Sequence, residues 1–283
     1  MSETNGFYTV EEVKERLSIS TLVFLQYRPV GESTLGELAR HGIQRIELLE
    51  SPEQFDMTSA GSMRYVGETC RSCGVEVGAY HAHLTSFSDL DTEEKRIARV
   101  DVCRRQIDTM LELGGVLWGS HARVADATLV RCYEELARHV EGTEAVIAVE
   151  NFTGEGMWVE DRMAFLDEID HPQVGMILDI GHVRTPDGMN PMTLPGGPTR
   201  VLELCGRRLR HVHLHGFKEG VDHFPPLVEG DGIQWVELFR MLRAVGYPGF
   251  MNFEPSGEPR HQGSLQAVSV APERIVEMDA EMG

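Results

Sequence analysis

The sequence predicts an α/β fold, a single (β/α)8 TIM barrel over residues 1–283 with an extra N-terminal helix, on three observations. Short runs rich in Val, Ile and Leu alternate with longer stretches of helical periodicity, and there are eight such runs. The chain of 283 residues is also close to the roughly 250 residues typical of this fold. In chain order, the candidate strands span residues 20–25, 45–50, 75–83, 116–121, 145–151, 174–182, 210–216 and 249–255.

The segments between the candidate strands are predicted to be helices. The first 15 or so residues predict a helix before the first strand, residues 92–113 and 235–246 are amphipathic, and a last, weak helix is expected near 272–282. A Gly suited to end a helix precedes several strands, as in "HGIQRIELLE" and "CGVEVGAY". A doubly wound sheet is the competing arrangement, but "FLQYRPVGES", after the first strand, lacks the Gly-rich phosphate loop usual there.

Composition narrows the class of partner. Lys and Arg number 26 against 45 Asp and Glu, which gives a formal charge of -19 and no basic stripe for a nucleic-acid backbone. No apolar run reaches the roughly 18 residues of a membrane helix, and the polar N-terminus has no export signal. The odd count of five cysteines indicates reduced thiols, and the "CRSC" pair at 70–73 lies in a predicted helix. We therefore expect a cytoplasmic protein with no nucleic-acid or membrane partner.

Polar side chains end the last four predicted strands. Glu150, Asp179, His213 and Glu254 each follow an apolar run, about one βα unit apart. Because active sites of such barrels form at the C-terminal ends of the strands, these side chains are expected to point at one place. Any one of them could be a helix cap, but three crowded carboxylates repel one another unless a cation lies between them. Three oxygen donors and an imidazole suit one divalent ion, Mn²⁺, Mg²⁺, Co²⁺ or Zn²⁺.

The motifs "VEN", "LDIGH", "HVHLHG" and "NFEP" resemble those of the xylose isomerase-like TIM-barrel superfamily, the sugar phosphate isomerase/epimerase family, over nearly the whole chain. The resemblance implies that Glu150, Asp179, His213 and Glu254 are the metal ligands and that His182 binds substrate. From the alternation of the strand, His211 lies one layer deeper than His213 and is expected to orient that ligand. The superfamily includes ketose 3-epimerases, hydroxypyruvate isomerase, inosose and 3-dehydroshikimate dehydratases, and endonuclease IV.

Further residues are candidates for substrate contact because they end a strand or follow one closely. They are His81, His83, Trp118, His215 and Lys218. For each the alternative is an ordinary role, core packing for Trp118 and a histidine, solvation for Lys218. Residues 222–235, "DHFPPLVEGDGIQW", are expected to form a loop over the mouth of the site.

The resemblance implies an isomerase or epimerase acting on a small sugar, keto-polyol or related carbonyl compound through a metal-stabilised enediolate. Glu150 and Glu254 would be the catalytic bases. The alternatives are a metal-dependent dehydratase of the inosose or 3-dehydroshikimate type, an endonuclease IV-like repair enzyme and a non-catalytic relative. Asp222 and His223 are adjacent, whereas the endonuclease branch has an Asp-x-His pair for extra zinc ions, and Glu219 stands where ketose epimerases place an Arg. The substrate class includes keto-acids, and a homodimer or homotetramer is the expected assembly.

Overall fold

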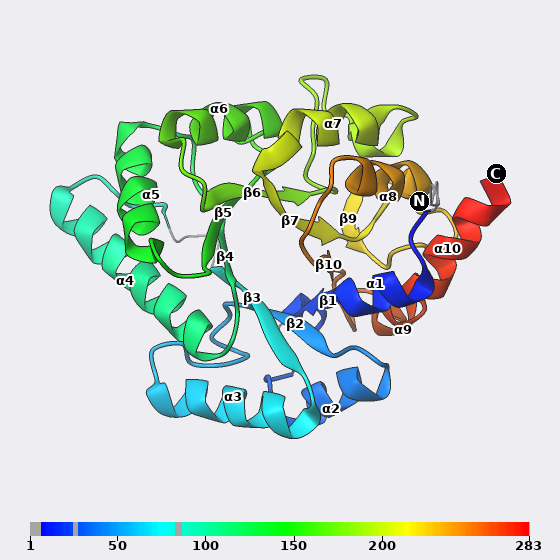
Figure 1. Ribbon diagram of the computed structural model, residues 1–283, viewed down its shortest axis with the longest axis horizontal. Helices are drawn as coiled ribbons and strands as arrows, with labels where there is room; N and C mark the ends of the chain where they lie inside the picture. The colour runs from blue at the N-terminus through cyan, green and yellow to red at the C-terminus, as the bar shows by residue number, and fades with distance from the viewer. Residues whose placement is uncertain (1–6, 25–27, 83–86, 283) are drawn as a thin grey trace, which may run out of the picture.

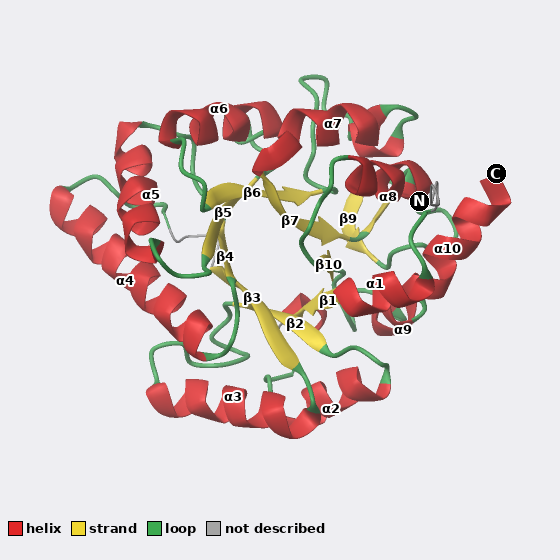
Figure 2. Cartoon of the chain, in the orientation of Figure 1, coloured by secondary structure: helices red, strands yellow, loops and turns green. Residues whose placement is uncertain are grey.

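Eight parallel strands close into a barrel surrounded by helices, as predicted, in the computed structural model (Figures 1 and 2). The structure describes residues 7–24, 28–82 and 87–282. Around the barrel the order is β1-β10-β7-β6-β5-β4-β3-β2. The strands are β1 (Leu17–Ser20), β2 (Arg45–Leu49), β3 (Glu76–Ala82), β4 (Leu117–Ser120), β5 (Val146–Glu150), β6 (Val174–Asp179), β7 (Leu209–Leu214) and β10 (Met251–Phe253).

The helices lie outside the ring of strands and begin at recognisable caps (Figure 2). Ser59, Thr92 and Asp126 each accept a hydrogen bond from a backbone N–H of the first turn, and Gly74 ends α3 at φ 67°, as its position in the sequence predicts. In the described part of the chain, no helix is long and apolar enough to cross a bilayer. The helices are α1 (Val10–Arg16), α2 (Glu32–Arg40), α3 (Ala60–Cys73), α4 (Glu93–Glu112), α5 (Ala127–Val140), α6 (Val159–Ile169), α7 (Gly197–Cys205), α8 (Trp235–Ala244), α9 (Ser264–Ser269) and α10 (Ala271–Met282).

The first strand lies earlier in the chain than predicted. β1 follows the extra helix α1 directly, and a 3-10 turn at Thr21–Phe24 occupies most of the predicted strand 20–25, whose last residue lies outside the described residues. Side chains replace the ladder there, since the Thr21 hydroxyl accepts from the N–H of Leu49 at 2.9 Å and Gln54 donates to the Thr21 carbonyl at 2.6 Å. These bonds end the strand where an apolar run alone predicts that it continues.

The segment after β7 is an antiparallel hairpin rather than a plain loop. It consists of β8 (Gly216–Lys218) and β9 (Val221–Phe224). Glu219 and Gly220 make the two-residue turn at φ 53° and 83°, the positive values that a tight hairpin turn of the I′ type requires. The rest of the predicted loop, from Pro225 to Gln234, has no helix or strand and leads into α8.

The interior of the barrel is divided between apolar and polar side chains. Four buried residues of β3 to β6 form an apolar cluster of their own, namely Ala79, Leu117, Ala148 and Ile177. By contrast, β2, β7 and β10 contribute the buried polar side chains of Glu47, His211 and Asn252. A polar interior is costly unless every group is paired, so this half of the barrel depends on its hydrogen bonds.

A buried arginine ties α6 to the ends of β4 and β5. The side chain of Arg162 is fully buried and its guanidinium donates to the carbonyls of Glu150 at 2.9 Å, of Arg123 at 3.1 Å and of Ala122. The guanidinium is therefore the donor for backbone groups that no strand pairs, at the end of the barrel where Glu150 lies.

We expect Arg162→Met to lower the free energy of unfolding by about 2–5 kcal/mol, because it leaves buried carbonyls without a donor. Urea unfolding followed by circular dichroism measures the change. Arg274→Met, which removes an exposed ion pair with Glu277, is the control and should change stability by less than about 0.5 kcal/mol. Equal losses in the two variants would contradict the role given to Arg162.

Candidate metal centre and active site

The four predicted ligands meet around one nitrogen atom. Nδ1 of His213 on β7 lies 3.0 Å from Oε2 of Glu254, 3.4 Å from Oε2 of Glu150 and 3.8 Å from Oδ2 of Asp179. All four side chains are buried. The parallel register produces this arrangement, since Asp179 pairs with His213 across β6 and β7 and the N–H of Glu254 donates to the carbonyl of Leu214 at 2.8 Å.

An amide side chain and two backbone N–H groups hold Asp179 in place. Asn151 donates to the Asp179 carbonyl at 3.0 Å and accepts from the Asp179 N–H at 2.9 Å, which extends the pairing of β5 and β6 by one residue. The Asp179 carboxylate accepts from the N–H groups of Gly181 and His182, both at 2.8 Å. This turn brings the ring of His182 back over the site, where its Nδ1 lies 3.1 Å from Oε1 of Glu150.

The charges in the cluster shift one another's pKa. Burial alone lowers the pKa of His213, but the carboxylates of Glu254, Glu47 and Glu150 raise it well above its usual value. Burial raises the pKa of Glu150, yet the imidazoles of His121 and His213 bring it well below the usual value. Without a metal ion, protons on the imidazoles therefore compensate the buried carboxylates.

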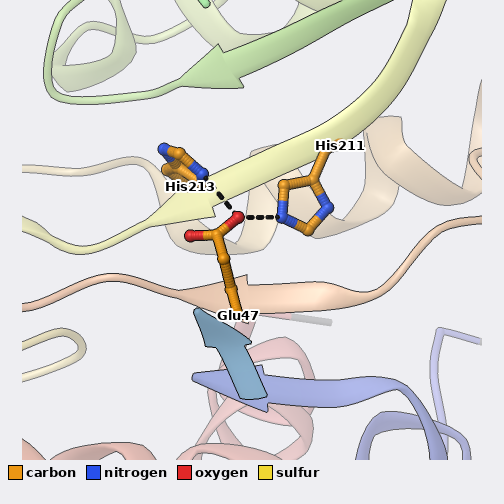
Figure 3. Close-up of side chains that lie close together, drawn as sticks. All are labelled: Glu47, His211 and His213. Carbon is orange, nitrogen blue, oxygen red and sulfur yellow. Dashed lines mark hydrogen bonds and ion pairs between the residues drawn. The ribbon is translucent and has the colours of Figure 1, made fainter. Parts of the chain in front are cut away.

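The atom at the centre of the cluster fits a metal ligand. Nδ1 of His213 is buried, and Oε2 of Glu254 lies 3.0 Å from it. The other nitrogen, Nε2, lies 3.2 Å from Oε2 of Glu47, so the proton of the neutral ring is placed there, and a metal ion that displaces the second proton finds a lone pair on Nδ1 (Figure 3). One imidazole nitrogen among three carboxylates is a donor set that divalent ions of the Mn²⁺, Mg²⁺, Co²⁺ and Zn²⁺ group accept.

Glu150 is also shared by imidazoles from β3 and β4. Its Oε2 lies 2.8 Å from Nε2 of His81, and its Oε1 lies 3.3 Å from Nε2 of His121. His81 and His182 were predicted to contact substrate, and the structure brings both to the cluster. His121, which directly follows β4, was missed as a site residue, although a histidine at a strand end is the signal used for the others.

The hairpin delivers two more donors. Oδ2 of Asp222 lies 3.5 Å from Nε2 of His182, and Nδ1 of His223 lies 2.8 Å from the Glu254 carbonyl. His223 has a φ of 49°, an uncommon value for a residue other than Gly, and this backbone conformation lets adjacent residues both reach the site. Asp222 and His223 therefore both lie beside the cluster although they are adjacent in the sequence.

The site contains more possible metal ligands than one ion requires. They form overlapping groups, each with ligand atoms close enough to hold a cation. Beside the group of Asp179, His213 and Glu254, the described residues contain four further groups, each of which shares a member with another group. These are Glu47, His211 and His213; His81, Glu150 and His213; His121, Glu150 and His182; and Asp179, His182 and His223.

The remaining candidates for substrate contact differ in their surroundings. Trp118 is fully buried and donates to Oε1 of Gln106 on α4 at 3.2 Å, so it packs between the barrel and the helices. Lys218, on β8, lies over the Phe224 ring, and its Nζ donates to the Glu229 carbonyl at 3.5 Å. His215 is fully buried, and its Nε2 lies 3.1 Å from Oδ1 of Asp179. His83 lies outside the described residues.

Glu47 is the largest omission from the sequence analysis. It lies on β2, which was given no functional residue, yet its carboxylate contacts both His211 and His213 (Figure 3). His211 was predicted to orient His213, but the structure places Glu47 between them. An acidic residue inside the apolar run "RIELL" is the signal that could have found it.

The sequence is similar to a known protein family. Residues 35–274 match the family described as Xylose isomerase-like TIM barrel. An uncharacterized protein of Methanocaldococcus jannaschii is 24% identical over 258 residues, covering 84% of this chain and 83% of that protein.

Several solved structures share the fold. A D-tagatose 3-epimerase-like protein superposes with a TM-score of 0.73 at 19% identity, covering 94% of this chain and 99% of the other. A xylose isomerase-like TIM barrel protein from Mycobacterium smegmatis, in complex with magnesium, has a TM-score of 0.73 at 16% identity over 98% and 100% of the two chains. A D-psicose 3-epimerase from Clostridium cellulolyticum H10, with D-tagatose, has a TM-score of 0.68 at 15% identity over 94% and 98%. With 240 consecutive residues spanned by the family match, the chain belongs to the xylose isomerase-like TIM barrel family.

Proposed function

We propose that the protein is a divalent-metal-dependent isomerase or epimerase acting on a small sugar, keto-polyol or related carbonyl compound. The observation that carries the proposal is the pair of buried glutamates near one imidazole nitrogen, with Glu254 at 3.0 Å and Glu150 at 3.4 Å from Nδ1 of His213. The sugar epimerases among proteins of the same fold support the substrate class.

The two glutamates are placed to exchange protons on opposite faces of a substrate. Along the order β10-β7-β6-β5, Glu254 and Glu150 occupy the two ends of an arc, with His213 and Asp179 between them. When bound, a divalent ion supplies a Lewis acid that polarises the substrate carbonyl and its neighbouring hydroxyl. One glutamate then removes the proton of the carbon between these oxygens, and the other returns a proton from the opposite side.

Both glutamates are held ready to act as bases. Although burial raises the pKa of Glu254, the imidazoles of His213 and His223 bring it below the usual value, so its carboxylate is ionised at neutral pH. The Ser20 hydroxyl donates to Oε1 of Glu254 at 3.1 Å and fixes its orientation. The same is true of Glu150, whose pKa is also lowered and which accepts from His81.

The outer side of the cluster supplies groups that can hold a polyhydroxylated substrate. His182 lies between Glu150 and Asp222, and despite burial the Asp179 carboxylate raises its pKa well above the usual value, so the ring is a charged donor. Phe152 contacts the rings of both His121 and His182, at centroid distances of 5.3 Å and 5.0 Å. Phe152 therefore offers an apolar wall beside these two imidazoles.

Two other functions have one observation each in their favour. A dehydratase would remove the same proton and expel a hydroxyl at the next carbon, and the charged ring of His182 is an acid that could protonate it. An endonuclease needs more than one ion, which the extra donor groups around His121 and His223 could hold. The formal charge of -19 opposes binding of a nucleic-acid backbone and favours the small-molecule reaction.

A substrate panel in D₂O tests the proposal. Ketoses, inososes and dehydroshikimate are incubated with metal-loaded protein, and deuterium in substrate and product is followed by NMR. We expect solvent deuterium at the carbon next to the carbonyl in at least one ketose or keto-polyol, even without net conversion. Loss of water with an inosose or dehydroshikimate as the sole active substrate would favour the dehydratase.

We expect metal removal to destabilise the protein. Binding to the native state alone adds roughly 2.7 kcal/mol at a hundredfold excess of ion over Kd, and the carboxylates repel once the ion is gone. EDTA should therefore lower the melting temperature, and Mn²⁺ or Co²⁺ should restore it, with one ion bound per chain by elemental analysis. An unchanged melt after verified metal removal would contradict the site, and two or more ions per chain would favour the endonuclease-type centre.

We expect metal affinity to fall as the pH falls. The carboxylates of Glu254, Glu47 and Glu150 raise the pKa of His213 in the metal-free protein, so below that pKa an incoming ion must displace a proton. The displaced proton weakens binding by about tenfold per pH unit. Calorimetric titrations at pH 6, 7 and 8 measure the slope, and a flat profile would mean that His213 loses no proton to the metal.

Substitution of the two glutamates separates proton transfer from metal binding. Glu254→Gln keeps an oxygen donor of the same length but loses the base, so the chemical step should fall by about 10²–10⁴-fold while part of the metal affinity survives. Glu150→Gln should behave alike if protons are exchanged on two faces. Loss of deuterium exchange in only one of the two would indicate a single base, and normal turnover in both would place the base elsewhere.

A further inference from the structure

Glu47 occupies the middle of the barrel interior, away from the substrate side of the site. It lies on β2 and is fully buried. Its Oε2 lies 3.0 Å from Nε2 of His211 and 3.2 Å from Nε2 of His213, and its Oε1 accepts from the Asn252 amide at 3.2 Å (Figure 3). Each oxygen of this carboxylate therefore faces a side chain on β7 or β10.

The contact crosses the barrel rather than following the ladder. β2 pairs with β1 and β3, and both β1 and β10 lie between β2 and β7 on the shorter way round. An interaction across the interior holds a side chain at a fixed depth and angle independently of its own strand. The distance from β2 to the histidines of β7 suits a Glu, because an Asp side chain is shorter by one methylene.

Resting on the metal-dependent function proposed above, we infer that Glu47 is a positioning residue that holds the proton of His213 on Nε2 and turns Nδ1 toward the metal centre. A carboxylate oxygen that faces Nε2 requires a proton between the two atoms. Nδ1 is then left with its lone pair, 3.0–3.8 Å from the oxygens of Glu254, Glu150 and Asp179. A hydrogen bond of this kind also makes the ring a stronger ligand, and its loss typically costs about 10–100-fold in metal affinity.

A purely structural role is the alternative, in which Glu47 merely satisfies His211 and Asn252 in a polar interior. That role predicts lower stability for a Glu47 variant and no effect on the metal. Glu237 is the matched control, because its carboxylate accepts from the N–H groups of Gly196 and Thr199 at 2.9 Å and 3.1 Å between α7 and α8. Glu237→Gln makes the same chemical change at a structural glutamate outside the barrel.

The test compares Glu47→Gln with Glu237→Gln by calorimetric titration of the folded, metal-free proteins with Mn²⁺ and Zn²⁺. We expect Kd to rise by about 10–100-fold in Glu47→Gln and by less than about threefold in Glu237→Gln. Parental affinity in folded Glu47→Gln would overturn the inference. If the parent protein binds no divalent ion, the proposed function fails, whereas an unaffected Glu47→Gln refutes only the role of Glu47.

A second measurement does not depend on the folding of the variant. Long-range ¹H–¹⁵N spectra of the Zn²⁺-loaded parent, with the His213 signal assigned by its loss in His213→Asn, report which ring nitrogen carries the proton. We expect a proton on Nε2, shifted downfield by its bond to Glu47, and metal on Nδ1. Metal on Nε2, or a rapidly exchanging Nε2 proton, would contradict the inference.

Discussion

The closure of the barrel is the constraint on which the candidate site depends. Parallel strands in register bring residues separated by whole βα units to the same end of the sheet, and closure makes them face one another across the barrel. Glu150 pairs with Ile177 and Asp179 with His213, so the ends of β5, β6 and β7 are stepped around the ring. No loop conformation is needed to assemble the central group, because the strands themselves determine where its side chains point.

Such a cluster is stable only as a charge-balanced unit. Glu47, Glu150, Asp179 and Glu254 are all buried, and in each case imidazoles lower a pKa that burial alone would raise. The imidazoles in turn depend on the carboxylates, as the raised pKa of His182 and His213 shows. Removal of one partner would leave a buried, uncompensated charge, which costs more than the pair contributes. A cation at Nδ1 of His213 would replace the protons on these rings without disturbing the balance.

The sequence was sufficient for the barrel and for the residues of the central group, because both follow from periodicity and from the position of polar residues at strand ends. It failed where both faces of a strand are buried. Every residue of β4 is buried, so the pattern of apolar residues could not distinguish the inward position of Gly119 from the outward position of Trp118. The hairpin was missed because its turn uses Glu219 and its site residue His223 has a positive φ, neither of which is typical of those residues.

His211 and His213 of β7 and His215, which directly follows it, alternate along the chain at different depths, and depth assigns each a different partner. His211, the deepest, contacts Glu47, and His215, nearest the mouth, contacts Asp179 and lies stacked on the ring of His223. Each of these two rings therefore has a carboxylate oxygen beside one ring nitrogen. His213 alone lies between two carboxylate layers, with Glu47 facing Nε2 and Glu254 3.0 Å from Nδ1. The alternation of the strand therefore places chemically identical side chains at successive levels, and the level decides which ring can exchange its proton on Nδ1 for a metal ion.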